Sequence, residues 1–132
     1  MKLCILGGGL TGLSLAKSLV KKGLSIDIFL NKKKSDFNRS RTIGISNDNL
    51  MYFNKEILDI KKLFWDIKKI EIYSDNLRNE KILNFENNNK TVFAIIRNYQ
   101  LQSKLLKSLK KDKLCKFKQN FNYNFSNLKK YK

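Results

Sequence analysis

Three glycines near the start of the chain have the spacing that a phosphate-binding turn needs. Gly7, Gly9 and Gly12 form the pattern Gly-x-Gly-x-x-Gly directly after the apolar residues 3–6. The first glycine can take the backbone conformation of a tight turn, the second leaves room for a pyrophosphate, and the third lets a helix pack close to a strand. A helix that begins here directs unpaired N–H groups and a positive dipole end toward the phosphates. The pattern predicts a dinucleotide-binding turn, with a glycine-rich turn of another kind of α/β protein as the alternative.

The flanking elements are those that must position such a turn. Residues 2–6 predict a buried strand, and residues 10–22 predict a helix with an apolar stripe that ends at Gly23 as its C-cap. Residues 25–30 alternate as a second strand. A β-α-β unit of about thirty residues has a right-handed crossover, so its strands are parallel neighbours. The sequence therefore predicts an α/β fold, a Rossmann-like βαβ domain with a parallel sheet, helices and additional short strands.

The rest of the chain predicts shorter elements. Ser46 or Asn47 is expected to cap a helix through about residue 55, and Asn98 to cap a helix whose leucine stripe is core packing. Residues 110–132 interleave lysines with aromatic residues, and we expect one or two strands there or poor order. Further strands are expected at 41–46, 68–74, 81–85 and 91–97, with a basic surface loop at 31–40 and a turn at 86–90.

Composition limits the possible function classes. The chain has 132 residues, the size of one domain. Its formal net charge of +17 accompanies abundant Lys, Asn and Ile and no Pro, which is the bias of an AT-rich coding sequence. The charge is therefore weak evidence about partners, and no specific nucleic-acid partner is expected. No apolar run is long enough to span a bilayer, and the start does not have the pattern of a signal peptide.

The residues that could hold a metal or move a proton are few. The chain contains no His, which removes imidazole ligands and His-based acid/base chemistry. Cys4 and Cys115 are too far apart in sequence to form a metal-ligand cluster, so no metal site is expected. Cys4 is expected to be a reduced, buried thiol of a cytosolic protein. No residue stands out as a catalytic acid or base, and the catalytic residues stay unknown.

Four segments occur in an informative order. They are Ile-Leu-Gly-Gly-Gly-Leu-Thr-Gly-Leu-Ser-Leu-Ala at 5–16, Arg-Thr-Ile-Gly-Ile-Ser at 41–46, Trp-Asp-Ile-Lys-Lys-Ile-Glu-Ile-Tyr at 65–73 and Ile-Ile-Arg-Asn-Tyr-Gln-Leu at 95–101. Many FAD and NAD proteins share the first, and the second and third narrow the choice by their distances from it. Over roughly residues 2–112 the chain resembles the FAD-dependent aromatic-ring monooxygenases, in particular the ubiquinone-biosynthesis hydroxylases.

The resemblance implies a set of cofactor-binding residues. In that family the glycine turn binds the ADP part of FAD, so the corresponding positions here are Gly7, Gly9, Leu10, Thr11 and Gly12. Thr11 and the neighbouring amides are expected close to the pyrophosphate. The family also places the arginine of the second segment near the flavin end of the cofactor, which implies that role for Arg41. A guanidinium can pair a phosphate through two parallel hydrogen bonds, and the alternative for Arg41 is a solvated loop charge.

The sequence departs from the family at two places. An acidic residue should end the second strand and accept hydrogen bonds from the ribose, but Leu30 and Asn31 stand there. The amide oxygen of Asn31 can accept such a bond, more weakly than a carboxylate. The family's later Gly-Asp motif and its β-sheet substrate domain do not occur in this sequence. We therefore expect residues 1–112 to be an incomplete FAD-binding domain, and residues 113–132 to be a basic, aromatic-containing tail or the start of the missing half.

The resemblance implies a FAD-binding fragment of a monooxygenase that hydroxylates an aromatic ring with reduced FAD and oxygen. It further implies NADPH or NADH as reductant and a small aromatic or quinone-precursor substrate. The missing half is either lost, in a decayed copy, or supplied by a second chain, in a split gene product. A cytoplasmic location with peripheral contact at the inner face of the membrane is expected. Two alternatives stay open. Lysines at 32–34 could hold the 2′-phosphate of NADP in an NADP- or NAD-binding protein, and residues 107–132 could form a basic nucleic-acid-binding module.

Overall fold

The structure is a computed structural model that describes residues 2–30, 39–75, 78, 80–88, 90–119 and 131. Asn31 and most of the predicted loop at 31–40 lie outside the described residues. The elements in chain order are β1 (Lys2–Leu6), α1 (Leu10–Lys21), β2 (Ser25–Leu30), β3 (Thr42–Ser46), α2 (Asn47–Tyr52), the π-helical turn η1 (Phe53–Ile57), β4 (Phe64–Ile67), β5 (Lys69–Tyr73), β6 (Lys81–Glu86), β7 (Phe93–Arg97), α3 (Asn98–Lys110) and β8 (Cys115–Gln119).

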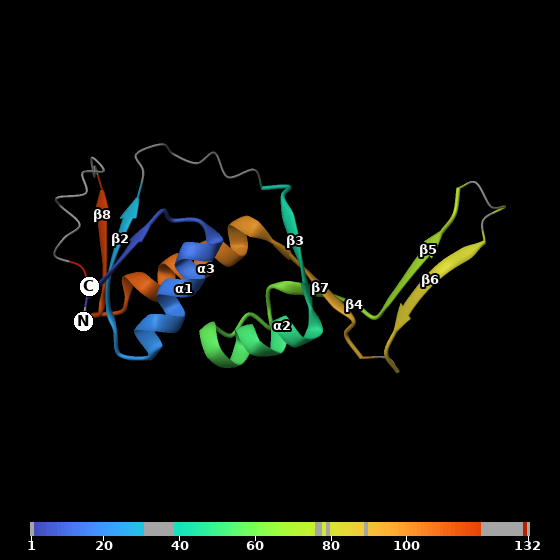
Figure 1. Cartoon of the computed structure of the whole chain (residues 1–132), viewed down its shortest axis with the longest axis horizontal. Helices are drawn as coiled ribbons and strands as arrows, with labels where there is room; N and C mark the ends of the chain where they lie inside the picture. The colour runs from blue at the N-terminus through green and yellow to red at the C-terminus, as the bar shows by residue number, and fades with distance from the viewer. Residues whose placement is uncertain are drawn as a thin grey trace.

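The predicted βαβ unit is confirmed. Strands β1 and β2 are parallel neighbours, with Lys2 opposite Ser25 and Leu6 opposite Phe29, and α1 connects them. Strand β8 pairs in parallel with the other side of β2, so the sheet order is β1-β2-β8. Figure 1 shows this sheet at one end of the molecule with α1 and α3 beside it. Strand β8 falls in the segment for which the sequence allowed one or two strands.

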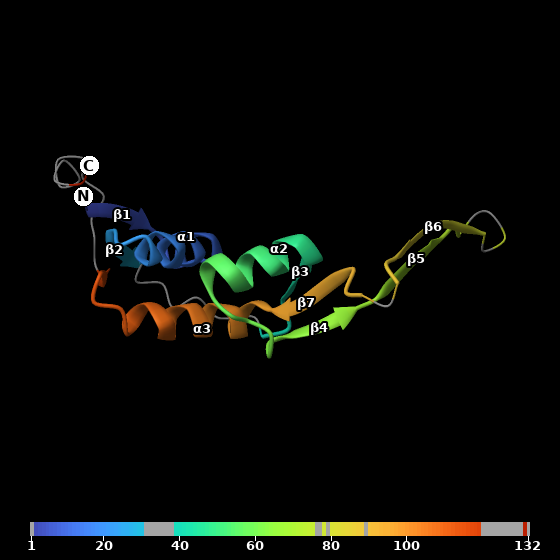
Figure 2. The same cartoon turned by 90° about the horizontal axis from the view of Figure 1, so that it is seen from below.

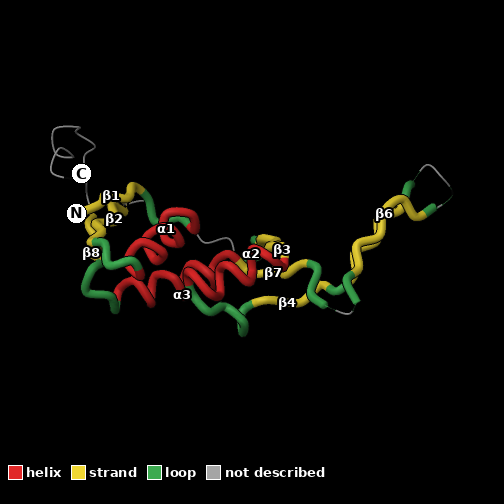
Figure 3. Tube along the Cα trace, turned by 60° about the horizontal axis from the view of Figure 1, so that its bottom comes forward, coloured by secondary structure: helices red, strands yellow, loops and turns green. Residues whose placement is uncertain are grey.

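The core lies where α1 and α3 pack on the parallel sheet. The leucine stripe predicted for α3 is confirmed as core packing, and each fully buried leucine stabilises the fold by about 1.5–3 kcal/mol. Figure 3 shows the helices gathered between the parallel sheet and a second sheet. The buried side chains of the two helices are Leu13, Ala16, Val20, Leu101, Leu105 and Leu109, and the parallel sheet adds Ile5, Ile26, Ile28 and Cys115.

The second sheet is antiparallel and has the order β3-β7-β4. One face packs on the core through Ile96 of β7 and its neighbours Ile43 and Phe64 on the flanking strands. On the other face the ring of Phe93 lies over Gly44, where any side chain at residue 44 would overlap the ring. Strand β7 runs directly into α3, so the central strand of this sheet and the core helix are one continuous stretch of chain.

A two-stranded ribbon projects from the body. Strands β4 and β5 are separated only by Lys68, and β5 pairs with β6 in an antiparallel hairpin that pairs with no other described strand. Figures 1 and 2 show this hairpin extending away from the helices and both other sheets. We call residues 68–86 the arm. The strands predicted near 68–74 and 81–85 are confirmed, whereas the sequence did not predict β4.

The structure tests the predicted N-caps of helices α2 and α3. Ser46 caps α2 as predicted, because its hydroxyl accepts the backbone N–H of Asn49 at 3.5 Å. The prediction that Asn98 caps α3 is wrong, since Arg97 holds the cap position in an extended conformation and Asn98 is already helical. The backbone N–H of Asn98 donates instead to the carbonyl of Arg41 at 3.0 Å.

The expectation for the cysteines needs one correction. Cys4 is half-buried rather than buried, because β1 lies at the edge of its sheet and Cys4 points away from the face on which Leu3 and Ile5 meet the core. Cys115 on β8 is the buried thiol. None of the described helices is both long and apolar enough to cross a membrane.

Candidate dinucleotide-binding site

The glycine turn has the geometry that its spacing predicts. Gly7 has φ +104°, in the left-handed region that favours glycine. A Cβ at Gly12 would lie 2.9 Å from the carbonyl oxygen of Gly7 and 3.3 Å from the side chain of Ile5, so the helix and the strand meet there without room for a side chain. A Cβ at Gly9 would meet no atom within 4 Å. The turn is therefore tight on its protein side and open on its outer side.

The turn leaves helix donors without helical partners. The N–H of Gly7 donates to the carbonyl of Phe29 at 2.9 Å, and the N–H of Leu13 donates to the carbonyl of Gly9 at 3.0 Å. Helix α1 therefore begins at Leu10 with Gly9 as N-cap, and no side chain caps it. The N–H groups of the first helical turn, before Leu13, have no intrahelical acceptor. No acidic residue lies in this turn, so its positive end is available to an anion.

Helix α3 contacts the turn through one side chain. The side-chain amide of Gln102 donates to the carbonyl of Gly8 at 2.7 Å across 94 residues of sequence. This bond fixes the orientation of the peptide group that joins Gly8 to Gly9. Sequence reasoning missed Gln102, because only its place beside the buried Leu101 and Leu105 marks it as facing the body.

The structure brings Arg41 to the same end of α3. Its carbonyl accepts the N–H of Asn98, and Asn98 lies one helical turn from Gln102, about 6 Å along the axis. The side chain of Arg41 is exposed. Arg97, for which the sequence predicted no role, lies opposite Thr42 in the β3–β7 ladder with its guanidinium 5.3 Å from the ring centre of Trp65. Arg41 and Arg97 therefore both lie where β3, β7 and α3 come together.

The remaining predicted residues are placed as follows. Thr11 is exposed on the first turn of α1, and Leu10 is half-buried against the core. Leu30 ends β2 with its side chain against Gly8, since a Cβ at Gly8 would lie 2.5 Å from its Cδ2. It supplies packing where an acidic residue would supply a ribose contact. The ribose role of Asn31 stays a prediction, because Asn31 is outside the described residues.

A buried carboxylate lies on the other face of the parallel sheet. Asp27 of β2 is fully buried, and its Oδ2 lies 3.0 Å from the Lys2 ammonium, 2.8 Å from that of Lys118 and 2.7 Å from the Tyr131 hydroxyl, which donates to it. Burial raises the pKa of Asp27, but the hydrogen bonds from Lys118, Tyr131 and Lys2 lower it further, to about 2. This cluster ties β1, β2 and β8 to Tyr131. Among the described residues no three His, Cys, Asp or Glu side chains are grouped to hold a metal.

Comparison with known proteins gives structural neighbours only. No family model matches the sequence, and no curated protein matches it. The structure is similar to p-nitrophenol 4-monooxygenase from Pseudomonas putida (TM-score 0.70, 16% identity, 89% of this chain and 31% of that chain). It is also similar to PqsL, a probable FAD-dependent monooxygenase from Pseudomonas aeruginosa (0.71, 14%, 90% and 32%). A third neighbour is HpxO from Klebsiella pneumoniae, solved with FAD and uric acid (0.64, 20%, 89% and 30%).

These similarities establish the fold. The chain has the mixed α/β architecture of these monooxygenase structures, with its parallel sheet and flanking helices. It spans about a third of the length of each neighbour.

Proposed function

We propose that this chain is the FAD-binding part of a flavoprotein monooxygenase. The observation that carries the proposal is the turn at residues 7–12, with left-handed Gly7, open space at Gly9 and close packing at Gly12. A turn of this shape, in a fold shared with monooxygenase structures, fits the pyrophosphate of a dinucleotide. The FAD found in the HpxO structure supports FAD as that dinucleotide.

The chain's own residues would bind and orient the cofactor. The free N–H groups of Leu10, Thr11 and Gly12 would donate to the pyrophosphate, and the Gln102 amide would keep the Gly8 peptide in place behind it. The exposed Arg41 would hold the cofactor toward its flavin end. Bound FAD would supply the oxygen chemistry through its reduced ring. No proton-transfer step is assigned to a residue of this chain.

The substrate and reductant follow from the resemblance of segments 41–46 and 65–73 to the ubiquinone-biosynthesis hydroxylases. We propose a small aromatic or quinone-precursor substrate and NADPH or NADH as reductant. Structures of HpxO with uric acid and of PqsL with 2-aminobenzoylacetate support a small organic substrate.

We propose that a second chain supplies the substrate pocket, and that the protein works in the cytoplasm with peripheral contact at the membrane. The NADP-binding and nucleic-acid-binding alternatives gain no support from the structural neighbours.

Titration of the purified chain with FAD tests the proposal. Wild-type protein is expected to quench flavin fluorescence and to rise in melting temperature with FAD, because a ligand that binds the native state stabilises it. Gly9→Asn should weaken FAD binding by about tenfold or more, since Asn is a strong N-cap whose side chain would take the N–H groups meant for the phosphates. The same cap preference should keep the unliganded melting temperature at or above that of the wild type.

The matched control is Gly23→Asn. It makes the same change at the other end of α1, at φ +80°, where a Cβ meets no atom within 4 Å and Asn tolerates the left-handed conformation. This variant should bind FAD like the wild type. The proposal is wrong if the wild type binds no FAD, if Gly9→Asn binds FAD unchanged, or if NADP stabilises the chain more than FAD does.

A further inference from the structure

The arm presents an apolar face to solvent. Ile70 lies opposite Phe85, and Ile72 opposite Leu83, so the four side chains share one face of the β5–β6 ladder. Ile72, Leu83 and Phe85 are 42%, 48% and 47% exposed, and all of β6 is exposed. A hydrophobic face on a projecting ribbon marks an interaction surface when nothing covers it. None of the described arm residues belongs to the buried core.

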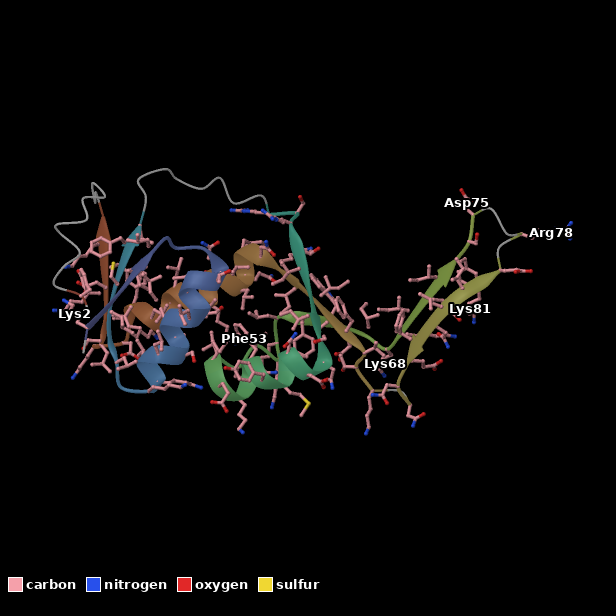
Figure 4. The ribbon with its side chains drawn as sticks, viewed as in Figure 1. Lys2, Phe53, Lys68, Asp75, Arg78 and Lys81 are labelled. Atoms are coloured by element: carbon pink, nitrogen blue, oxygen red, sulfur yellow. The ribbon has the colours of Figure 1, made fainter. Side chains whose placement is uncertain are left out.

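The opposite face of the arm is ionic and internally paired. The Glu71 carboxylate contacts the Lys69 ammonium at 3.0 Å, accepts a second ion pair from Lys81, and accepts the Tyr73 hydroxyl at 3.2 Å. The arm holds four cations and four acidic residues, so it has no net charge in a chain of +17. Its four cations are Lys68, Lys69, Arg78 and Lys81, and its acidic residues are Glu71, Asp75, Glu80 and Glu86. Figure 4 shows Lys68 at the base of the arm and Asp75 and Arg78 at its tip.

This charge pattern favours a protein partner over a membrane. An anionic lipid surface attracts clusters of unpaired Lys and Arg. On the arm, two lysines already pair with Glu71, and carboxylates match the cations in number. The excess positive charge of the chain is carried by residues outside the arm. A neutral ribbon with one apolar face is the surface that packs on another sheet or helix.

The size of this face argues against a dimer of the chain that is held together by the arms alone. Strands of five and six residues give a ribbon about 20 Å long and about 10 Å wide. Two such faces would bury far less than the roughly 800 Å² per partner of a stable interface. The partner must therefore contact the chain elsewhere as well. Strand β1 offers such a place, because its outer edge pairs with no described strand and Leu6 on it is 49% exposed.

We infer that the apolar face of the arm, formed by Ile70, Ile72, Leu83 and Phe85, docks the polypeptide that supplies the rest of the flavoprotein. The inference rests on the proposed function, because the chain spans only about a third of each neighbour's length and that function requires the remaining two thirds. The inference goes beyond that function because it names the surface to which the second chain binds and the type of contact that holds it. The arm packs by hydrophobic contact, and its paired polar face remains in solvent.

A photo-crosslinking experiment tests this docking. A benzoylphenylalanine is placed at residue 83 on the apolar face or at residue 84, the neighbouring position on the polar face opposite Glu71. Each purified chain is irradiated in a lysate of the source organism with its membranes, and adducts are identified by mass spectrometry. We expect residue 83, and not residue 84, to link to a polypeptide carrying the Gly-Asp motif and substrate sheet that this sequence lacks. Adducts only with lipid, with a second copy or with unrelated proteins, no adduct, or equal labelling at both positions would overturn the inference.

The identified polypeptide then allows a matched affinity test. Leu83→Lys and Asn84→Lys add the same charge to adjacent exposed residues, and only the first lies on the docking face. Leu83→Lys should weaken binding by about tenfold or more, whereas Asn84→Lys should bind like the wild type. Unchanged binding by Leu83→Lys would overturn the inference. The FAD titration of the chain alone reports separately on the proposed function, so crosslinking at residue 83 without FAD binding would reject only FAD binding by this chain.

Discussion

At the scale of single residues, Gly9 and Gly12 belong to one motif but have opposite surroundings. Gly12 is enclosed by the Gly7 carbonyl and the Ile5 side chain, whereas Gly9 faces open space. Gly12 is therefore needed by the fold, whereas the open space at Gly9 is what the proposed dinucleotide would require. Sequence spacing alone gives the two positions equal weight, and only the packing separates their roles.

Gly12→Ala should destabilise the protein with or without cofactor. Its Cβ would lie 2.9 Å from a backbone oxygen that cannot rotate away, so α1 must move from the strand. Overpacking of this kind lowers the free energy of unfolding by about 1–3 kcal/mol. Urea unfolding measures the change, with Gly9→Asn as the variant expected to unfold like the wild type. Equal stability of Gly12→Ala and wild type would contradict the close packing.

Asp27 makes stability depend on pH in the acid range. Its pKa falls from 3.8 to about 2 on folding, so its contribution is complete above pH 4 and is lost as the pH falls toward 2. A pKa shift of this size corresponds to about 2 kcal/mol in the free energy of unfolding. The free energy of unfolding of the wild type should therefore decrease between pH 4 and pH 2.

Asp27→Asn should reduce this dependence and lower stability at neutral pH, because Lys2 and Lys118 lose the charge that they share. Urea titrations at several pH values check both effects. A variant with the same acid-dependent slope as the wild type would show that other carboxylates cause the loss.

Cys115 should be nearly inert in the native protein. Burial is the main reason that its pKa rises from 9.0 to about 11, so only about one thiol in a thousand is ionised at pH 8. In a Cys4→Ser background, Cys115 should react with a disulfide reagent far more slowly in buffer than in urea. Similar rates in the two conditions would contradict its burial.

At the scale of elements, α3 links the core to the glycine turn through Gln102. Gln102→Ala removes the donor to the partly buried Gly8 carbonyl, so the free energy of unfolding should fall by about 1 kcal/mol. FAD affinity should fall several-fold, since the peptide behind the phosphates would be less fixed. Gln100→Ala on the same helix is the control and should leave both measurements unchanged. If both variants behave alike, the effect comes from the helix rather than from the tether.

The elements also show what sequence patterns reveal. Strands β1 and β2 and helix α1 were predicted within a residue or two, because apolar periodicity and glycine punctuation are local signals. Strand β4 was missed since only Lys68 separates it from β5, and no local signal shows that the chain passes there from the body to the arm. Gln102 was missed because its partner is 94 residues away. The N-cap of α3 was misplaced because Asn98 finds its acceptor at Arg41, in another part of the sequence.

At the scale of the whole molecule, the arm and the body should be separable in stability. None of the described residues between 69 and 90 is in the buried core, so replacing residues 69–90 with an Asn-Gly turn should keep the fold. Far-UV circular dichroism and thermal melting should show a transition within a few degrees of the wild type, and FAD titration an unchanged affinity. Loss of the cooperative transition would show that the arm supports the body and is more than a docking element.

The Asp27 cluster also sets an order in time. Tyr131 follows Asp27 by 104 residues in the sequence. Lys118, the other late partner of Asp27, comes shortly before Tyr131. At about 5–20 residues per second, Asp27 is therefore synthesised roughly 5–20 seconds before its last partner. Until residues 115–119 are synthesised, strand β2 can pair with β1 but not with β8. The parallel sheet can close over this charge with all its partners only after Tyr131 is made, so the complete cluster records that synthesis has passed residue 131.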